Sequence, residues 1–332
     1  MKKLINDPIE VTNEMVEGFV AAYPNTVKKI DGHNVVVRTE APIEGKVGIV
    51  SGGGSGHEPF WLGYTGIGFI DATVVGNIFS SPTPPSIYEA TKAVDGGKGV
   101  LYVLGNYAGD KMNFNIAAEM ARAEGIRVEM TQVTDDIASA PKGSEDKRRG
   151  IAGNIFALKI AGAKAEEKAS FDEVKTVVEK VNSNLRTMGL AISPCTIPAA
   201  GTPHFTLEDD EFELGMGIHG EPGIRRMKMK TANEIVEMMA TRMLDDLPYR
   251  SGDEVAILVN GLGATPLLEL LIIFRKFKDI LKSSDISIYR SYIGNYVTSL
   301  EMAGMSLTLL RLDNELKYLL NAPANTPFFF TP

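Results

Sequence analysis

The sequence is poor in cysteine and contains no long hydrophobic run. Its one cysteine, Cys195, cannot form an internal disulfide, which is typical of proteins that work in the reducing cytoplasm. No apolar run approaches the roughly 20 residues that a membrane-spanning helix needs. The N-terminal "MKKLINDPIEV" lacks the apolar stretch of a signal peptide. We therefore expect a cytoplasmic protein that does not contact a membrane.

Positive charge is also scarce. The 34 lysines and arginines are outnumbered by 42 aspartates and glutamates, which gives a formal net charge of −8. A surface that binds nucleic acid needs a surplus of positive charge, so we expect no direct contact with nucleic acid. No cluster of histidine, cysteine and acidic residues has the spacing of metal ligands, so we expect no metal site.

A glycine-rich stretch, "VGIVSGGGSGHEP" (residues 47–59), lacks the usual features of a nucleotide-binding loop. A Walker loop needs Gly-Lys-Ser/Thr after its glycines, and the dinucleotide fingerprint needs G-x-G-x-x-G before a helix. Here His57 takes the place of the phosphate-binding lysine. The G-x-S-x-G motif of a nucleophilic serine does not occur either.

What the sequence does contain is an alternation of β-branched apolar runs and helical patterns. In the first half we expect a helix over 112–126, closed by Gly125, and four strands, over 46–51, 69–75, 99–107 and 127–133. We expect the glycines to follow the first of these strands as a turn. Strands separated by helices of this length indicate a largely parallel sheet.

The second half has the same character. After a long loop over 139–154, which includes "SEDKRRG" as a solvated segment, residues 155–184 are mostly helical. Further on, 211–214 reads as a strand that leads into a turn, 253–277 as strand, glycine turn and helix, and 286–294 and 306–313 as strands. A chain of this length favours two domains. We therefore predict an α/β fold of two α/β domains, residues 1–185 and 186–332, each on a mainly parallel or mixed sheet.

Three residues are candidates for chemistry because of their positions after strands. His57 and His219 each lie in a glycine-bearing turn after an apolar strand, and Asp110 follows another strand. Open α/β sheets bind ligands at the carboxyl ends of their strands, and a histidine and an aspartate on neighbouring strand ends can form an acid–base pair. The alternative for Asp110 is a helix N-cap. His33 and His204 we expect to be structural or merely exposed.

The glycines of "VNGLGATPLLEL", Gly261 and Gly263, allow two interpretations. A phosphate could bind at this turn between strand and helix. A tight packing turn is the simpler explanation.

The motifs together resemble the dihydroxyacetone kinase family, and within it the dihydroxyacetone-binding K subunits. The resemblance extends over almost the whole chain and rests on "SGGGSGHEP", "SPTP", "NYAGDKMNF", "IPAAGTPHFTL", "GMGIHGEPGI", "VNGLGATPLLEL" and "TSLEMAGMSLTLL".

This resemblance implies a site and a mode of binding. The histidine of the G-I-H-G-E-P-G turn, His219, would hold dihydroxyacetone covalently as a hemiaminal, and His57 and Asp110 would be the acid–base groups. The site would lie between the two domains, and the substrate would also be lined by Gly53, Gly54, Ser55 and Gly56. The family further implies a homodimer and no cofactor on this chain, since ADP or ATP and magnesium belong to a separate L subunit.

The site motif departs from the family pattern. Where kinase members read Lys-Asn-Tyr-Thr-Gly-Asp, this chain has Gly105 for the lysine and Ala108 for the threonine, and we expect no basic residue of the motif to replace that lysine. Trp61, Asn77 and Pro85 stand where the family often has histidine, glutamate and aspartate.

These departures favour a non-catalytic role. We predict a dihydroxyacetone-sensing coactivator of a transcription regulator that controls a dihydroxyacetone kinase operon. The alternative is a catalytic subunit of a phosphotransferase-system-dependent kinase that works with an L subunit. A third possibility is an α/β protein that binds a sugar without a covalent step.

Overall fold

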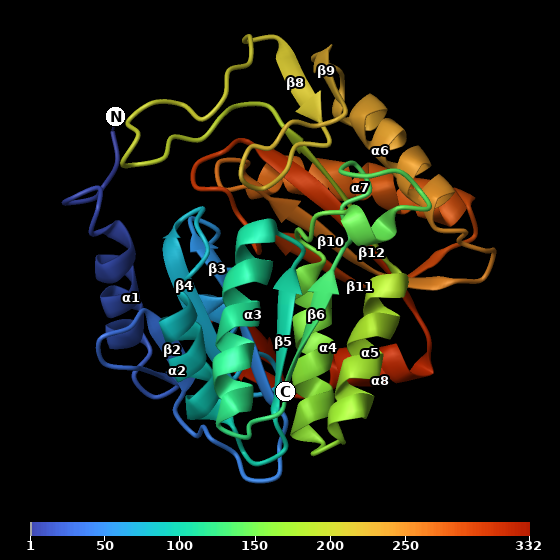
Figure 1. Ribbon diagram of the computed structural model, residues 1–332. Helices are drawn as coiled ribbons and strands as arrows, with labels where there is room; N and C mark the ends of the chain where they lie inside the picture. Colours follow the sequence, from blue (N-terminus) through green and yellow to red (C-terminus); the bar gives the residue numbers. More distant parts are fainter. Residues whose placement is uncertain (1) are drawn as a thin grey trace. The chain divides into compact units, whose positions relative to one another are not determined.

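A computed structural model describes residues 2–332, which fold into two compact units (Figure 1). We name each unit after its candidate histidine. The His57 unit comprises Lys2–Val133, Ile155–Val181 and Leu316–Pro332, and the His219 unit comprises Thr134–Asn154 and Asn182–Glu315. Each unit contains one six-stranded sheet with helices, so the predicted α/β fold with two α/β domains is confirmed.

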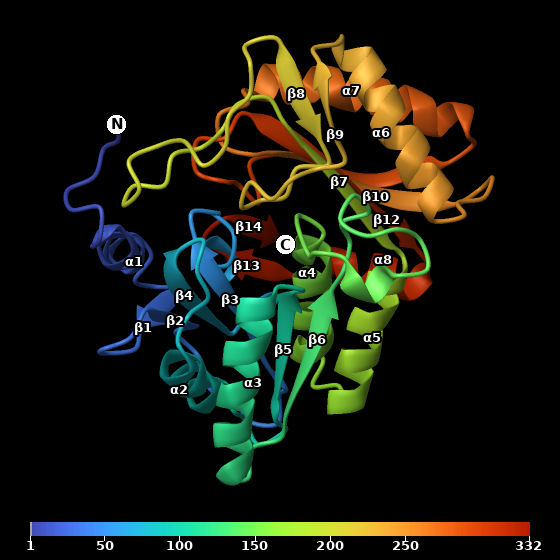
Figure 2. The same cartoon turned by 45° about the horizontal axis from the view of Figure 1, so that its top comes forward.

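The predicted domain boundary between residues 185 and 186 differs from this division, because both units are discontinuous in sequence. The segment before α4 joins the His219 unit by pairing with β7: Thr187 N–H donates to Asp135 O (2.8 Å) and Ile137 N–H donates to Thr187 O (3.0 Å). The C-terminal residues join the His57 unit, where the buried ammonium of Lys159 donates to Leu319 O (2.9 Å). Figure 2 shows these red C-terminal elements next to α4.

The sheet of the His57 unit has the order β1-β2-β4-β3-β5-β6, in which β4, β3, β5 and β6 run parallel to one another. Strands β1 and β2 add an antiparallel edge. The elements of this unit are α1 (Val11–Ala22), β1 (Val27–Lys29), β2 (Val35–Arg38), β3 (Gly48–Ser55), η1 (Leu62–Tyr64), β4 (Ala72–Ile78), α2 (Pro84–Val94), β5 (Val100–Gly105), α3 (Ala108–Ala123), β6 (Val128–Val133), α4 (Asn154–Glu166), α5 (Phe171–Ser183), α8 (Asn314–Asn321), β13 (Ala324–Thr326) and β14 (Phe329–Thr331).

Most expected elements of the first half are present, with one correction. The four strands and the helix exist, and Gly125 closes α3 in a left-handed conformation (φ 86°), with Ile126 N–H donating to Ala121 O (3.1 Å). The glycines after Ser51 do not form a turn, however. They continue strand β3 to Ser55, because each lies where a neighbour leaves no room for a Cβ atom.

The sheet of the His219 unit is mixed and mostly antiparallel. Its order is β11-β10-β12-β7-β8-β9, and of its neighbouring pairs β10 and β11 run parallel. The elements are η2 (Glu145–Lys147), β7 (Leu185–Ala191), β8 (Glu211–Leu214), β9 (Arg225–Lys228), α6 (Ala232–Asp246), β10 (Glu254–Gly261), α7 (Leu267–Ser283), β11 (Ser287–Gly294) and β12 (Gly304–Leu312).

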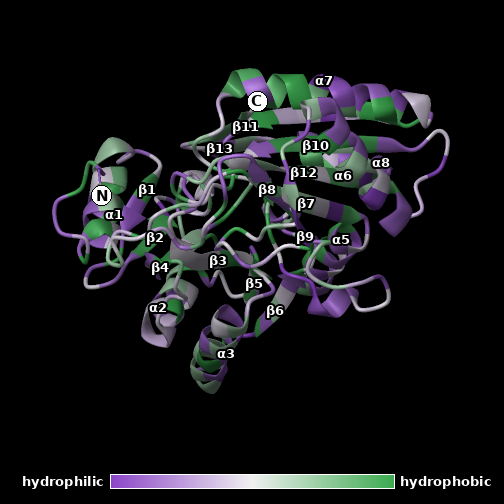
Figure 3. Ribbon diagram, turned by 90° about the horizontal axis from the view of Figure 1, so that it is seen from above, coloured by the Kyte–Doolittle hydropathy of each residue, from purple (hydrophilic) through white to green (hydrophobic). Residues whose placement is uncertain are grey.

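Helices α6 and α7 cover this sheet with amphipathic faces. Figure 3 shows hydrophobic and hydrophilic residues alternating along α7. The residues of α7 that are buried are Leu270, Ile273, Phe277 and Leu281, a spacing of three or four residues. Helix α6 begins with a capping box, in which the side chain of Thr231 accepts a hydrogen bond from the N–H of Glu234 and the Glu234 carboxylate accepts one from the N–H of Thr231.

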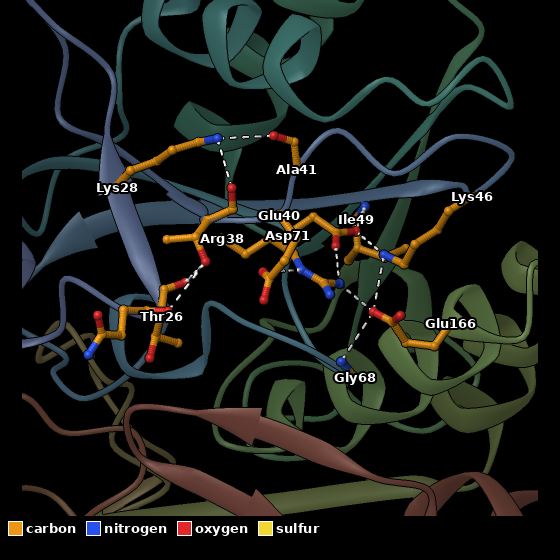
Figure 4. A network of polar contacts seen from close by, with 12 residues as sticks. Thr26, Lys28, Arg38, Glu40, Ala41, Lys46, Ile49, Gly68, Asp71 and Glu166 are labelled. Carbon is orange, nitrogen blue, oxygen red and sulfur yellow. Dashed lines mark hydrogen bonds and ion pairs between the residues drawn. The ribbon is translucent and has the colours of Figure 1, made fainter.

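A buried cluster of charges lies at the amino ends of the parallel strands in the His57 unit (Figure 4). Arg38 forms ion pairs with Asp71 (3.0 Å) and with Glu166, and Lys46 forms an ion pair with Asp71. The Asp71 carboxylate also accepts a hydrogen bond from the N–H of Ile49 (2.8 Å). Arg38 also pairs with Glu40 (3.3 Å), so each positive group of the cluster has a negative partner, which is what burial of charge requires.

In the part of the chain that the structure describes, no helix is both long enough and apolar enough to cross a membrane.

Candidate functional site

Three neighbouring parallel strands of the His57 unit, β4, β3 and β5, end at one edge of the sheet, where α/β folds commonly bind ligands. His57 lies two residues after β3, and Asp110 lies just after β5. The predicted arrangement of a histidine and an aspartate on neighbouring strand ends is therefore present in this unit.

The glycines of β3 let other residues pack directly on the strand. A Cβ atom at Gly53 would overlap the indole ring of Trp61, and one at Gly54 would overlap the backbone of Phe79 and Ser80. Ser55 is fixed by a hydrogen bond between its hydroxyl and that of Thr12 in α1 (2.9 Å). Gly53, Gly54 and Ser55 are thus buried strand residues, and Trp61 covers the first of them.

His57 is completely buried between two aromatic rings. Its imidazole stacks on Phe79 at 4.9 Å between centroids, and Trp61 meets it edge-on at 5.6 Å. Both aromatic residues have positive φ angles, 55° for Phe79 and 61° for Trp61. Bulky side chains rarely adopt this conformation, and such strain persists where a fixed local geometry is needed. The orientation of the His57 ring is therefore firmly set by its neighbours.

The next residue, Glu58, stabilises the turn itself. Its carboxylate accepts hydrogen bonds from the N–H of Gly56 (3.0 and 3.1 Å). Burial raises the pKa of Glu58, and hydrogen bonds from the backbone N–H groups of Glu58 and Gly56 partly oppose that increase. Glu58 therefore contributes to the shape of the loop that carries His57.

Asp110 lies inside α3, in its first turn, and not at the N-cap. The N-cap is Tyr107, whose side chain makes no capping hydrogen bond. The alternative interpretation of Asp110 as an N-cap is therefore wrong, because the helix begins earlier than the sequence predicted. A carboxylate in the first turn is favoured by the helix dipole.

The loop after β4 connects the surroundings of Asp110 and His57. Asn113 of α3 donates a hydrogen bond to Pro82 O (2.9 Å), and a Cβ atom at Gly109 would lie 3.5 Å from the Cβ of Ser81. The same loop contributes Phe79, on which His57 stacks. The two candidate residues thus flank one loop.

A lysine that directly follows the Gly105–Asp110 motif reaches toward the end of β5. Lys111 Nζ donates to Asn106 Oδ1 at 3.3 Å, next to Gly105. A long side chain one helical turn away can reach back to the strand end, which spacing along the sequence conceals.

His219 lies in a loop of the other unit, residues 215–224, which connects β8 and β9. The loop begins with Gly215 N–H donating to Gly189 O (2.7 Å) and closes with Ile224 N–H donating to Leu214 O (2.7 Å). Gly215 and Gly220 have φ angles of 84° and 79°, which glycine adopts without strain.

Glu221 contacts His219 through both oxygens of its carboxylate. The backbone N–H of His219 donates to Oε2, and the ring Nδ1 lies against Oε1, both at 2.9 Å. Burial opposes ionisation of Glu221, but the hydrogen bond from His219 and the positive charges of His219 and Arg149 outweigh it and lower the pKa to about 2. An ionised carboxylate only accepts hydrogen bonds, so Nδ1 carries the hydrogen and the lone pair of the neutral ring is on Nε2.

Sequence reasoning did not identify Glu221, Arg149 and Asp136 as part of this site. Arg149 Nη1 lies 3.9 Å from Glu221 Oε2, and its Nε donates to Asp136 Oδ2 at 2.8 Å. Asp136 is completely buried, and burial raises its pKa to about 6 although Arg149 opposes the shift. The acidic residue two positions after His219 in "GIHGEPG" was the one available signal.

The prediction of a solvated "SEDKRRG" loop is wrong for its two arginines. Arg148 is completely buried and forms a two-bond ion pair with Asp246 (2.6 and 2.8 Å). Arg149 is mostly buried against Asp136. Planar guanidinium groups pair well with buried carboxylates from distant segments, and the local sequence does not reveal such partners.

The two histidines expected to be structural or exposed lie outside these groups. His33 Nδ1 forms a hydrogen bond with the Ser86 hydroxyl (3.0 Å). His204 is exposed, and its backbone N–H donates to Cys195 O (3.0 Å). A Cβ atom at Gly220 would overlap the His204 ring, so the 195–205 segment lies against the His219 loop.

Gly261, the last residue of β10, and Gly263 are packed against other parts of the chain. A Cβ atom at Gly261 would overlap Asn295 Oδ1, and one at Gly263 would overlap the carbonyl of Leu300. This supports the packing-turn interpretation over a phosphate site. Among residues 2–332, no group of three or more histidine, cysteine or acidic side chains is placed to hold a metal ion.

Comparison with known proteins gives one consistent family. The Dak1 domain family matches residues 17–328. The dihydroxyacetone-binding subunit DhaK of PTS-dependent dihydroxyacetone kinase 2 from Listeria innocua is 47% identical over 330 residues, 99% of each chain. The corresponding subunit from Lactococcus lactis is 45% identical over 314 residues, 95% of this chain and 94% of that one.

The comparison with solved structures leads to the same family. The dihydroxyacetone kinase operon co-activator Dha-DhaQ superposes with a TM-score of 0.91 at 33% identity, over 98% of this chain and 99% of that chain. This chain belongs to the Dak1 family and is similar throughout its length to DhaK subunits.

Proposed function

We propose that the protein binds dihydroxyacetone covalently through His219. Nε2 of the ring attacks the ketone carbon, the carbonyl electrons move onto oxygen, and that oxygen takes a proton to give a hemiaminal. The ring becomes positively charged when the bond forms. The Glu221 carboxylate, 2.9 Å from Nδ1, stabilises that charge or accepts the Nδ1 proton.

The observation that carries this proposal is the double contact of Glu221 with His219. A nucleophilic imidazole needs its lone pair on the attacking nitrogen and a partner that orients the ring. The ionised Glu221 supplies both conditions, because it accepts the Nδ1 hydrogen and also the backbone N–H of the same residue.

His57 and Asp110 are proposed as the groups that give and take protons. Support comes from their positions on neighbouring strand ends and from the fixed orientation of His57 between Phe79 and Trp61. Proton transfer needs such fixed geometry. That Gly53, Gly54, Ser55 and Gly56 contact the ligand stays a prediction, as does the homodimer.

Covalent binding would also account for selectivity. Glycerol matches dihydroxyacetone in size and in its terminal hydroxyls, so hydrogen bonds alone would separate the two compounds poorly. A hemiaminal forms only with a carbonyl compound.

For the role of the bound ligand, the favoured proposal is a sensor that acts as coactivator of a transcription regulator. Gly105 and Ala108 remove a cation and a hydroxyl from the proposed substrate motif, and phosphoryl transfer relies on positive charge near the transferring group. The similarity to the co-activator Dha-DhaQ supports this role.

The alternative is a catalytic dihydroxyacetone-binding subunit that receives phosphoryl groups from a nucleotide-carrying L subunit. Two observations support it: the relatives named as kinase subunits are 45% and 47% identical, and Lys111 brings a cation next to Gly105.

One assay tests both the binding of dihydroxyacetone and the role of the bound ligand. Purified protein is mixed with dihydroxyacetone and the nucleotide-loaded L subunit of a related kinase. Dihydroxyacetone phosphate is then assayed, and native mass spectrometry of the intact protein records ligand retained on the chain. Retention without turnover supports the sensor, and turnover establishes the kinase subunit.

The His219→Ala variant decides whether binding is covalent. We expect it to lose retained ligand and most of its affinity for dihydroxyacetone. Affinity equal to that of the unmodified protein would instead favour a sugar-binding protein without a covalent step.

A further inference from the structure

We propose that Arg149, anchored by Asp136, is a positioning residue that holds the Glu221 carboxylate against His219 and so keeps the ring in its nucleophilic tautomer. This inference rests on the proposed function. It assigns a role to a segment, residues 134–154, that lies far from His219 in the sequence.

Arg149 contacts both ends of the His219 loop. Its Nη2 donates to Gly215 O at 3.1 Å, where the loop leaves β8, and its Nη1 lies 3.9 Å from Glu221 Oε2. A guanidinium group can make these contacts together because its donors have a fixed, planar arrangement. Arg149 therefore fixes the distance between the start of the loop and the carboxylate that orients His219.

Asp136 and Ser139 hold Arg149 in place. Asp136 Oδ2 accepts from Arg149 Nε at 2.8 Å, and the backbone N–H of Asp136 donates to Arg149 O at 3.1 Å. The backbone N–H of Arg149 donates to the Ser139 hydroxyl at 2.9 Å, and that hydroxyl donates to Asp136 O at 2.8 Å. Each group in this small network is positioned by at least two contacts, so the guanidinium has little freedom to move.

Gly217 shows how closely the loop encloses the Glu221 carboxylate and the Arg149 guanidinium. A Cβ atom at this position would overlap both Glu221 Oε2 and Arg149 Nη1. The φ angle of Gly217 is outside the left-handed region, so alanine is compatible with the backbone there. The glycine is therefore explained by the space that the carboxylate and guanidinium occupy.

The test combines ligand capture with the tautomer of His219. The Arg149→Met and Gly217→Ala variants are labelled with ¹⁵N histidine, and the nitrogen chemical shifts of the His219 ring are recorded at pH 8. We expect the unmodified protein to show hydrogen on Nδ1, and both variants to show a mixture of tautomers and about tenfold weaker dihydroxyacetone capture, as when a group that orients a functional histidine is lost. Arg149→Lys, which keeps the charge without the fork, should recover part of the capture.

Two controls separate positioning from stability. Arg148→Lys alters the adjacent buried arginine, which pairs with Asp246, and Gly18→Ala adds a Cβ atom where nothing lies within 4 Å. Both should keep the Nδ1 tautomer and full capture. Unchanged tautomer and capture in Arg149→Met and Gly217→Ala would overturn the inference. Absence of capture in the unmodified protein would instead overturn the proposed function.

Discussion

At the scale of single residues, the identity of residues 105 and 108 separates the two proposed roles. Gly105 ends β5 and Ala108 begins α3, so both are placed beside the candidate ligand site of the His57 unit. We predict that Gly105→Lys together with Ala108→Thr gives at least tenfold more dihydroxyacetone phosphate with a nucleotide-loaded L subunit, because a cation offsets the charge of the transferring group. A coupled enzymatic assay measures the product.

Lys111→Met is the comparison for that experiment. If the unmodified chain already turns over at the rate of a kinase subunit and Lys111→Met abolishes this activity, Lys111 supplies the cation and the sensor proposal is wrong. Lys92→Met, on the outer face of α2, serves as control because Lys92 pairs with Glu89 (2.9 Å).

The pKa of Glu221 predicts how stability changes with pH. Its value of about 2 lies below the ordinary 4.5, so folding favours the ionised form. The resulting stabilisation is fully present above about pH 4.5 and is lost as the pH falls toward 2, and it amounts to about 3 kcal/mol. We expect the difference in free energy of unfolding between the unmodified protein and Glu221→Gln to shrink between pH 5 and pH 3, measured by urea unfolding.

A glutamate-to-glutamine substitution on the surface provides the control for this pH dependence. Glu237 is an exposed residue of α6 that pairs with Lys276. Glu237→Gln should differ from the unmodified protein by a small and nearly constant amount over the same range. A constant difference for Glu221→Gln as well would contradict the assigned pKa.

At the scale of elements, strand β3 depends on its glycines for packing. We predict that Gly53→Ala lowers the free energy of unfolding by about 1–3 kcal/mol, because the new methyl group overlaps the Trp61 indole. In a Trp61→Leu background the same change should cost less, since the overlapping ring is gone. Thermal unfolding followed by circular dichroism measures both costs, and equal costs in the two backgrounds would refute the contact.

The same strand shows what sequence patterns predict at this scale. Apolar, β-branched runs located the central strands, and Gly125 located the end of α3, because these signals are local. The glycines of β3 were predicted to form a turn, because the residues that require glycine there pack on the strand from other parts of the chain. Short or terminal elements such as β9 and α8 were missed because their stability comes from tertiary contacts.

The candidate site also contains residues that the sequence signals and residues that it does not. His57, Asp110 and His219 were recognisable as candidates because each follows a strand in a glycine-bearing stretch, and their roles stay predictions. Arg149 and Asp136 were not, since their role depends on a segment that crosses to the other sheet and pairs with β7. Charge partners that are distant in sequence leave no periodic signal.

At the scale of the whole molecule, the C-terminal residues complete a unit whose other parts lie far earlier in the chain. Ile67 and Asn325 exchange backbone hydrogen bonds (2.9 and 3.1 Å), and Phe69 meets Phe329 edge-on at 5.2 Å. The apolar residues that this segment buries are Leu316, Leu319, Leu320, Ala324 and Phe329. At about 2 kcal/mol for each large side chain, their burial is comparable to the stability of a typical domain, about 5–15 kcal/mol.

A chain that ends at Glu315 should therefore lose the fold of the His57 unit while the His219 unit remains folded. The sequence provides a reporter, because its single tryptophan, Trp61, is buried in the His57 unit. We expect red-shifted Trp61 emission and no cooperative transition in that signal on heating, whereas circular dichroism still records unfolding of the His219 unit. The full-length Phe330→Ala variant, which alters an exposed side chain of the same segment, should keep both signals. Unchanged Trp61 emission and melting in the shortened chain would show that residues 2–133 and 155–181 fold without the C-terminal segment.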